Sequence, residues 1–122
     1  GVSIQGADRI TVDHDGVYNI QCSLQLTKSD AGNDDVDIWL RYNGVDIPYS
    51  NGVVTIIGNN GKGIASWNLF QTMTASSYCQ LVWSSSDTGV SIYSIGTQSS
   101  PTRPATPSII VTVDKISSLT GI

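Results

Sequence analysis

Residues 16–27 carry the clearest pattern of apolar and polar positions in the chain. Every second residue from Tyr18 to Leu26 is hydrophobic, and the residues between them are polar. A helix would place apolar residues three and four positions apart, whereas a strand turns successive side chains to opposite faces. The pattern therefore predicts a strand with one buried and one polar face. Because a lone strand is marginal in water, a second layer must cover the apolar side.

Similar patterns and turn signals predict further strands along most of the sequence. Asn43-Gly44 is a strong hairpin signal between two of them. A helix over 64–73 is the weaker alternative, because the segment lacks a capping residue and follows a glycine-rich stretch. By position, the predicted strands beyond the first are 2–5, 9–12, 36–42, 45–49, 53–57, 64–73, 78–85, 90–95 and 108–116.

Three polar segments, 28–35, 58–63 and 96–107, are predicted to be loops. The last contains three prolines, which remove backbone donors and exclude a central strand. About ten short strands without a helix predict an all-β, two-sheet jelly-roll sandwich that occupies 1–122 as one domain. The first residues, from Gly1 to Ser3, suggest that the domain is the C-terminal part of a longer chain.

Size and charge narrow the function classes. The 122 residues are 39% hydrophobic and 13% charged, which suffices for one two-layer core. The net charge of −4 argues against nucleic acid or an anionic membrane as a partner, since both require a basic surface. No apolar run approaches the roughly 20 residues that span a bilayer, so we expect no membrane insertion.

The two cysteines, Cys22 and Cys79, fall at inward positions of two different predicted strands. We expect a pair of buried thiols that act as small hydrophobic side chains. A disulfide between the two layers is the alternative, although secreted domains of this size usually carry more cysteines. The cysteine count leaves the compartment open.

The residue types argue against catalysis. His14 is the single histidine, no nucleophile-elbow motif is present, and one histidine with two separated cysteines does not make a zinc site. We therefore expect no enzyme and no catalytic residue. A glycoside hydrolase is the minor alternative, because aspartates distant in sequence can meet in space. Its candidate carboxylates are Asp8, Asp13, Asp15 and Asp46.

An acidic segment raises the question of calcium. Oxygen ligands on a flexible loop suit Ca²⁺, but the spacing of these residues does not match the EF-hand loop. A solvated turn is the favoured interpretation over a calcium site, and we expect no cofactor. The segment contributes Asp30, Asn33, Asp34, Asp35 and Asp37.

Several short motifs recur in an order known from one domain family. They are Gly16 with Tyr18, Arg41 with Asn43-Gly44, and Pro107-Ser108. With them, residues 8–117 resemble the jelly-roll domain shared by tumour necrosis factor and the globular head of complement's first component. The likeness extends in particular to the phage version found in virion fibres and decoration proteins. The resemblance implies a ten-strand jelly roll, a homotrimer and a non-catalytic role in structure or binding.

Large side chains at outward positions suggest where the copies of a trimer meet. Trp39, Tyr78, Val82 and Ile110 all alternate with predicted core residues. Outward hydrophobic side chains often mark an interface, and a cyclic trimer could bury them as one contiguous patch. The alternative is that they are scattered exposed residues, which are normal on soluble proteins.

Two functions remain from the sequence. The first is a trimeric fibre or knob domain on the virion surface that binds a host receptor or glycan through the three loops at one end. The second is a secreted, extracellular, cytokine-like or lectin-like trimer of cellular origin. Aromatic rings can stack on sugars while polar side chains bond their hydroxyl groups. The candidate ligand-binding residues are Tyr49, Asn51, Asn59, Asn60 and Arg103.

Overall fold

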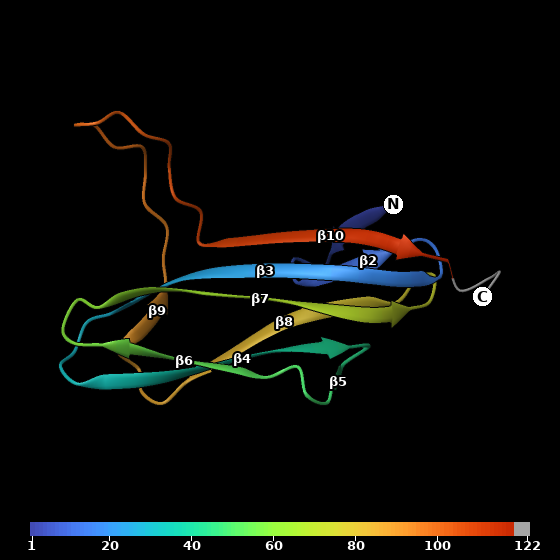
Figure 1. The fold of residues 1–122 in the computed structure, drawn as a ribbon, viewed down its shortest axis with the longest axis horizontal. Helices are drawn as coiled ribbons and strands as arrows, with labels where there is room; N and C mark the ends of the chain where they lie inside the picture. The colour runs from blue at the N-terminus through green and yellow to red at the C-terminus, as the bar shows by residue number, and fades with distance from the viewer. Residues whose placement is uncertain (119–122) are drawn as a thin grey trace.

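The computed structural model describes residues 1–118, which form ten β-strands and no helix (Figure 1). The predicted all-β class is therefore confirmed, including a strand rather than a helix over 64–73. Within the described part of the chain, no helix could cross a membrane. The strands are β1 (Val2–Gln5), β2 (Arg9–Val12), β3 (Gly16–Lys28), β4 (Asn33–Tyr42), β5 (Val45–Asp46), β6 (Gly52–Ile57), β7 (Lys62–Met73), β8 (Tyr78–Ser85), β9 (Val90–Ile92) and β10 (Ile109–Ser117).

The strands form two antiparallel sheets that pack as a sandwich. Sheet A has six strands in the order β1-β2-β8-β4, with β5 and β6 both paired to the free edge of β4. Sheet B has four strands in the order β10-β3-β7, with β9 also paired to β3. Both β9 and β10 therefore extend β3 along the same edge, at opposite ends of the strand. The long strand β3 is the common partner of all strands in sheet B.

The core lies between the sheets and consists of the inward rows predicted from alternation. From β3, every second residue between Tyr18 and Leu26 is at most 4% exposed. The facing row of β4, from Val36 to Leu40, is at most 2% exposed. Trp67 on β7 packs against both halves of this core. The two rows thus bury each other, as the pattern requires.

The residues that carry the family resemblance have local structural roles. Asn43 and Gly44 have φ angles of 50° and 81°, which is the geometry of a tight type I′ hairpin turn. Gly16 lies so close to β10 that a Cβ there would be 2.7 Å from the Ser117 carbonyl oxygen. The Tyr18 hydroxyl donates to the His14 carbonyl at 2.7 Å, which closes the turn before β3.

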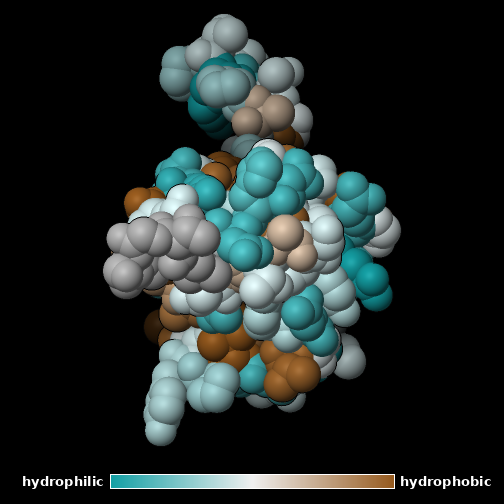
Figure 2. All heavy atoms as spheres, turned by 90° about the vertical axis from the view of Figure 1, so that its right-hand side faces the viewer, coloured by the Kyte–Doolittle hydropathy of each residue, from teal (hydrophilic) through white to brown (hydrophobic). Residues whose placement is uncertain are grey.

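Residues 93–108 form an arm that leaves the body between β9 and β10 (Figures 1 and 2). Two isolated bridges, Ile95 to Thr106 and Gln98 to Arg103, hold its two sides together. The predicted surface loop over 96–107 is confirmed, but the preceding strand ends at Ile92 rather than at residue 95. Ile92 forms the last pair of β9 with β3, opposite Leu26, and after this pair the chain leaves the sheet and enters the arm.

The inward side of β10 is less covered than the sequence indicates. Ile109 and Val111 do share the inward face, because they pair with Leu24 and Cys22 of β3. They are nevertheless 42% and 37% exposed, since β10 is an outermost strand and only its Val113 packs against the core. The strand therefore presents hydrophobic side chains on both faces.

Cys22 and Cys79 are buried free thiols in the same core cluster, as the favoured interpretation predicts. Burial raises the pKa of the Cys22 thiol to about 11 and, with a contribution from Cys22, that of Cys79 to about 12. A thiol in this state is a poor nucleophile and a poor metal ligand at neutral pH.

We expect neither thiol of the folded protein to react with iodoacetamide at pH 8, and both to react in 6 M guanidinium chloride, because unfolding exposes them. Intact-mass spectrometry after a short exposure counts the labels. Both folded-state pKa values lie above the ordinary thiol value, so folding stability falls as the pH rises through the range from about 9 to about 12. Labelling of the native protein at pH 8 would contradict the buried placement.

Candidate functional site

An open pocket of about 390 Å³ lies on the outer face of sheet A. Strand β4 forms its floor. Because Val36, Ile38 and Leu40 face the core, Asp37 and Trp39 between them face outward. Its wall is the segment 47–51, which links β5 to β6 and which we call the linker. We call the cavity the Tyr49 pocket. It is lined by Asp37, Trp39, Asp46, Ile47, Tyr49, Ser50, Asn51 and Ser84.

The linker is a tight turn fastened to β4 by a buried serine. The Ser50 amide donates to the Ile47 carbonyl at 3.3 Å, which closes a four-residue turn with Pro48 at its second position. The Ser50 hydroxyl, 3% exposed as a residue, donates to the Ile47 carbonyl at 2.8 Å and accepts from the Leu40 amide at 3.2 Å. These bonds fix the third turn residue, Tyr49, in space.

Tyr49 combines full exposure with an unfavourable backbone conformation. Its φ angle is 63°, in a turn position that normally selects glycine or asparagine. Its side chain is fully exposed, at 103% of the reference area. A bulky residue with positive φ is uncommon and costs free energy, of order 1–2 kcal/mol. The exposed ring does not offset this cost by burial in the core.

Trp39 is held in one orientation by a shared carboxylate. Its indole Nε1 donates to Asp46 Oδ1 at 2.9 Å, and Arg41 Nε donates to the same oxygen at 2.7 Å. The Arg41 guanidinium lies 6.0 Å from the indole ring centre. The bonds from Arg41 and then Trp39 lower the pKa of Asp46, so the group stays a carboxylate. It is suited to accept hydrogen bonds rather than to act as a general acid.

A second carboxylate flanks Trp39 on the other side along β4. The Asn51 amide Nδ2 donates to Asp37 Oδ1 at 3.0 Å, which ties the linker to β4. Among the described residues, no hydrogen bond uses the second oxygens of Asp37 and Asp46. The pocket therefore combines two aromatic rings with two carboxylates that have spare acceptor capacity.

The structure separates the predicted ligand-binding residues into two groups, one on the outer face of sheet A and one at the end of the sandwich that carries the arm. Tyr49 and Asn51 line the same pocket. Asn59 and Asn60 lie in the turn between β6 and β7, and Arg103 lies in the arm, where it donates to the carbonyls of Ser99 and Pro101. Figure 1 shows the β3–β4 loop, the β6–β7 turn and the base of the arm at one end, as predicted, away from β5.

The four predicted interface residues do not form one contiguous patch. Trp39 and Val82 are cross-strand partners on the outer face of sheet A. Tyr78 belongs to the same face and lies under the Arg9 guanidinium, 4.3 Å from its ring centre. Ile110 lies on the outer face of sheet B, on the opposite side of the sandwich. Alternation assigns a side chain to a face of its strand but does not say which sheet contains the strand.

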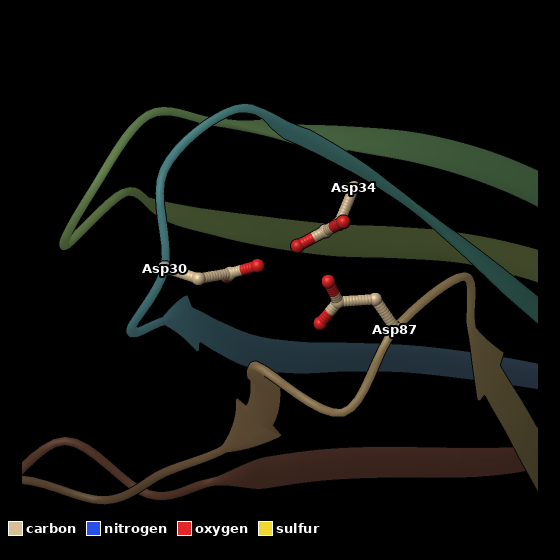
Figure 3. A group of neighbouring side chains, drawn as sticks. All are labelled: Asp30, Asp34 and Asp87. Carbon is tan, nitrogen blue, oxygen red and sulfur yellow. The ribbon is translucent and has the colours of Figure 1, made fainter.

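Two aspartates of the acidic loop and Asp87 from the β8–β9 turn point toward one another and form a cluster (Figure 3), and the buried Lys28 lies beside them. Carboxylate oxygens of Asp30, Asp34 and Asp87 lie within 4.8 Å of one another. Lys28 Nζ lies 3.2 Å from Asp30 Oδ1 and 3.4 Å from Asp34 Oδ2, with a side chain that is 0% exposed. It also donates to the carbonyls of Asp30 and Gly32 at 2.7 and 2.8 Å.

This arrangement differs from the calcium set considered from the sequence. Asp35 accepts a hydrogen bond from Thr55 on the outer face, and Asp37 belongs to the Tyr49 pocket, so the five acidic-segment residues do not converge. The carboxylates that could hold a cation are the three of the cluster, and the Lys28 ammonium already lies among them. Hydrogen bonds with Asp87 and then Lys28 lower the pKa of Asp30.

The aspartates of the hydrolase alternative have separate structural partners. Asp8 accepts from the Gln80 amide, Asp13 pairs with the amino terminus at 2.9 Å, and Asp15 accepts from the Ala75 amide. His14 lies exposed in the turn before β3. Asp46 lines the Tyr49 pocket, whereas Asp8, Asp13 and Asp15 are not among the residues that line it.

Comparison with known proteins assigns no function to these residues. The chain matches no protein-family model and has no significant match among curated proteins.

We expect Lys28→Met to lower the free energy of unfolding by about 3–5 kcal/mol at pH 7, because it leaves the buried Asp34 carboxylate without its cation. Urea unfolding measures the change, and Lys62→Met at an exposed position is the control. Asp30 has a lowered folded-state pKa, so its contribution is present above about pH 4 and lost as the pH falls through that lower value. The difference between parent and variant should accordingly narrow in acid.

Because Lys28 supplies the positive charge of the cluster, we expect EDTA to leave the melting temperature of the parent unchanged. A parent that EDTA destabilises, or a Lys28→Met variant as stable as the Lys62→Met control, would contradict it.

Proposed function

We propose that this domain is a non-enzymatic structural and attachment module on a virion surface, a trimeric fibre or knob domain with a tumour-necrosis-factor-like jelly-roll topology. In this role it joins three copies of the fibre and binds a host surface receptor or glycan. The proposal combines the motif resemblance with the order of the strands and the character of one sheet face.

The path of the chain supports the jelly-roll topology. The chain passes from sheet A to sheet B between β2 and β3, and returns to sheet A at β4. It crosses again at β7, returns at β8, and ends in sheet B with β9 and β10. Repeated crossing between two antiparallel sheets is typical of jelly rolls rather than of simple meanders.

The outer face of sheet B is the observation that carries the assembly proposal. Of the 16 charged residues of the chain, three adjacent strands present only two on this face, Lys62 beside Thr27 and Asp114 beside Asn19, toward opposite ends of β3. Depletion of charge distinguishes the centre of an interface from ordinary surface. The uncharged part of the face consists of Asn19, Gln21, Ser23 and Gln25 on β3, Ile64, Ser66, Asn68 and Phe70 on β7, and Ile110 and Thr112 on β10.

Exposed hydrophobic side chains surround the polar centre of this face. Ile64, Phe70 and Ile110 are 62%, 58% and 53% exposed. A hollow of about 360 Å³ lies over Gln21 and Ser23 between them. Side chains of this kind are exposed in one copy and can be buried when copies associate. Ile110 is the one predicted interface residue that the structure places here.

Size-exclusion chromatography with light scattering tests the assembly. We expect the parent at three times the 13.0 kDa chain mass. Phe70→Asp combined with Ile110→Asp should give a monomer, because it places carboxylates in the centre of the contact. Val45→Asp, at a position 70% exposed in β5 of sheet A, is the matched control and should remain a trimer.

A monomeric parent at tens of micromolar would contradict the trimer. A double variant that stays trimeric would contradict the assignment of the contact to sheet B.

A further inference from the structure

We propose that the Tyr49 pocket binds an uncharged saccharide, such as a neutral hexose or N-acetylhexosamine unit of a glycan. Tyr49 is the ring on which a sugar stacks, and Asp37, Asp46 and Asn51 are its hydrogen-bonding partners. The inference rests on the proposed attachment function for its biological purpose and specifies the ligand class and the site of that function.

The exposed ring of Tyr49 offers a flat apolar surface to a ligand. A sugar ring has a face of C–H groups that packs against an aromatic face, and tyrosine offers this area with few rotatable bonds. The turn that holds Tyr49 is fixed by Pro48 and by the buried Ser50 hydroxyl. The platform is therefore preorganised, and binding loses little backbone entropy.

The polar groups around the ring match the hydroxyl groups of a sugar. Asp37 and Asp46 each have one carboxylate oxygen without a hydrogen-bond partner among the described residues. The Asp37–Asn51 pair at 3.0 Å places an acceptor and an amide side by side, which suits adjacent hydroxyl groups that both donate and accept. Trp39, fixed by Asp46, completes the floor.

Charge favours an uncharged ligand. Arg41 is bonded to Asp46, whereas the partner of Asp37 is the neutral amide of Asn51. The pocket thus keeps a net negative charge, and no lysine lines it. The carboxylate of a sialic or uronic acid, or a sulfate, would meet this charge without a free cation, which disfavours acidic sugars.

The openness of the pocket indicates how such a ligand is held. A shallow site of about 390 Å³ can hold one or two rings of a chain without enclosing them. Single contacts of this kind are weak. If three copies associate, three sites acting together raise the overall affinity for a surface that carries many glycans.

An immobilised panel of neutral oligosaccharides, built from glucose, galactose, mannose and N-acetylglucosamine units, tests the site with the full chain. The same compounds capped with sialic acid or sulfate form the second half of the panel. We expect the parent to bind members of the neutral half and to bind their capped forms more weakly. Tyr49→Gly should weaken binding by at least about tenfold, because it removes the stacking ring.

Tyr49→Gly also separates binding from folding. Glycine adopts positive φ without steric strain, so the variant should keep the thermal stability of the parent or exceed it. Tyr49→Phe retains the ring and should retain binding. Gln5→Ala, exposed on β1 and separated from β4 by β2 and β8, should bind as the parent does.

Three results would overturn the inference: a parent that binds nothing on the panel, a parent that binds only capped glycans, and a Tyr49→Gly variant that binds like the parent. Light scattering on the same samples distinguishes this failure from that of the proposed assembly. A trimer that binds nothing overturns the sugar site alone. A monomer that binds neutral glycans through Tyr49 overturns the trimer alone.

Discussion

The burial of one face of β3 is the constraint on which the rest of the structure depends. Each fully buried aliphatic side chain contributes about 1.5–3 kcal/mol, whereas an exposed ion pair contributes about 0–1 kcal/mol. The inward row from Tyr18 to Leu26 therefore outweighs any surface contact in fixing the strand. A slip of one residue would turn this whole row to solvent, so the register is strongly specified. The same constraint places the uncharged row of β3 outward, along the centre of the outer face of sheet B.

The facing strand β4 applies the same rule to sheet A. Because Val36, Ile38 and Leu40 face the core, Asp37 and Trp39 must face outward, where the linker completes a pocket around them. The rule also explains the buried charges. Lys28 and Asp34 continue the inward rows of β3 and β4, and each is buried because the other neutralises it at 3.4 Å.

The sequence was sufficient to predict the elements and their faces, but not their contacts in space. Strands β1, β2 and β8 begin and end at the predicted residues, since clear turn signals bound them. The phase of Lys28 with Leu24 and Leu26 could have revealed its burial, although its charge suggested a loop. Asp87 joins the acidic cluster from a distant turn, and no local pattern could have paired it with Asp30.

The site shows the same limit. Tyr49 and Asn51 were predicted to bind a ligand from residue type, but the positive φ of Tyr49 and the bonds of Ser50 depend on the folded linker. The sequence correctly predicts that Trp39 faces outward, and it suggests an interface there. Alternation does not show that Trp39 and Arg41 both donate hydrogen bonds to Asp46. The sequence also correctly predicts that Ile110 faces outward. However, Ile110 lies in sheet B, whereas Trp39 and Val82, predicted to share its interface, lie in sheet A.

The central claim is that β3 buries its even-numbered side chains and presents its odd-numbered ones. Urea unfolding of Leu24→Ala and Ser23→Ala, adjacent residues on opposite faces, tests it most directly. We expect the free energy of unfolding to fall by about 2–5 kcal/mol for Leu24→Ala and to change by no more than about 0.5 kcal/mol for Ser23→Ala. Equal effects of the two substitutions, or a larger loss for Ser23→Ala, would contradict it.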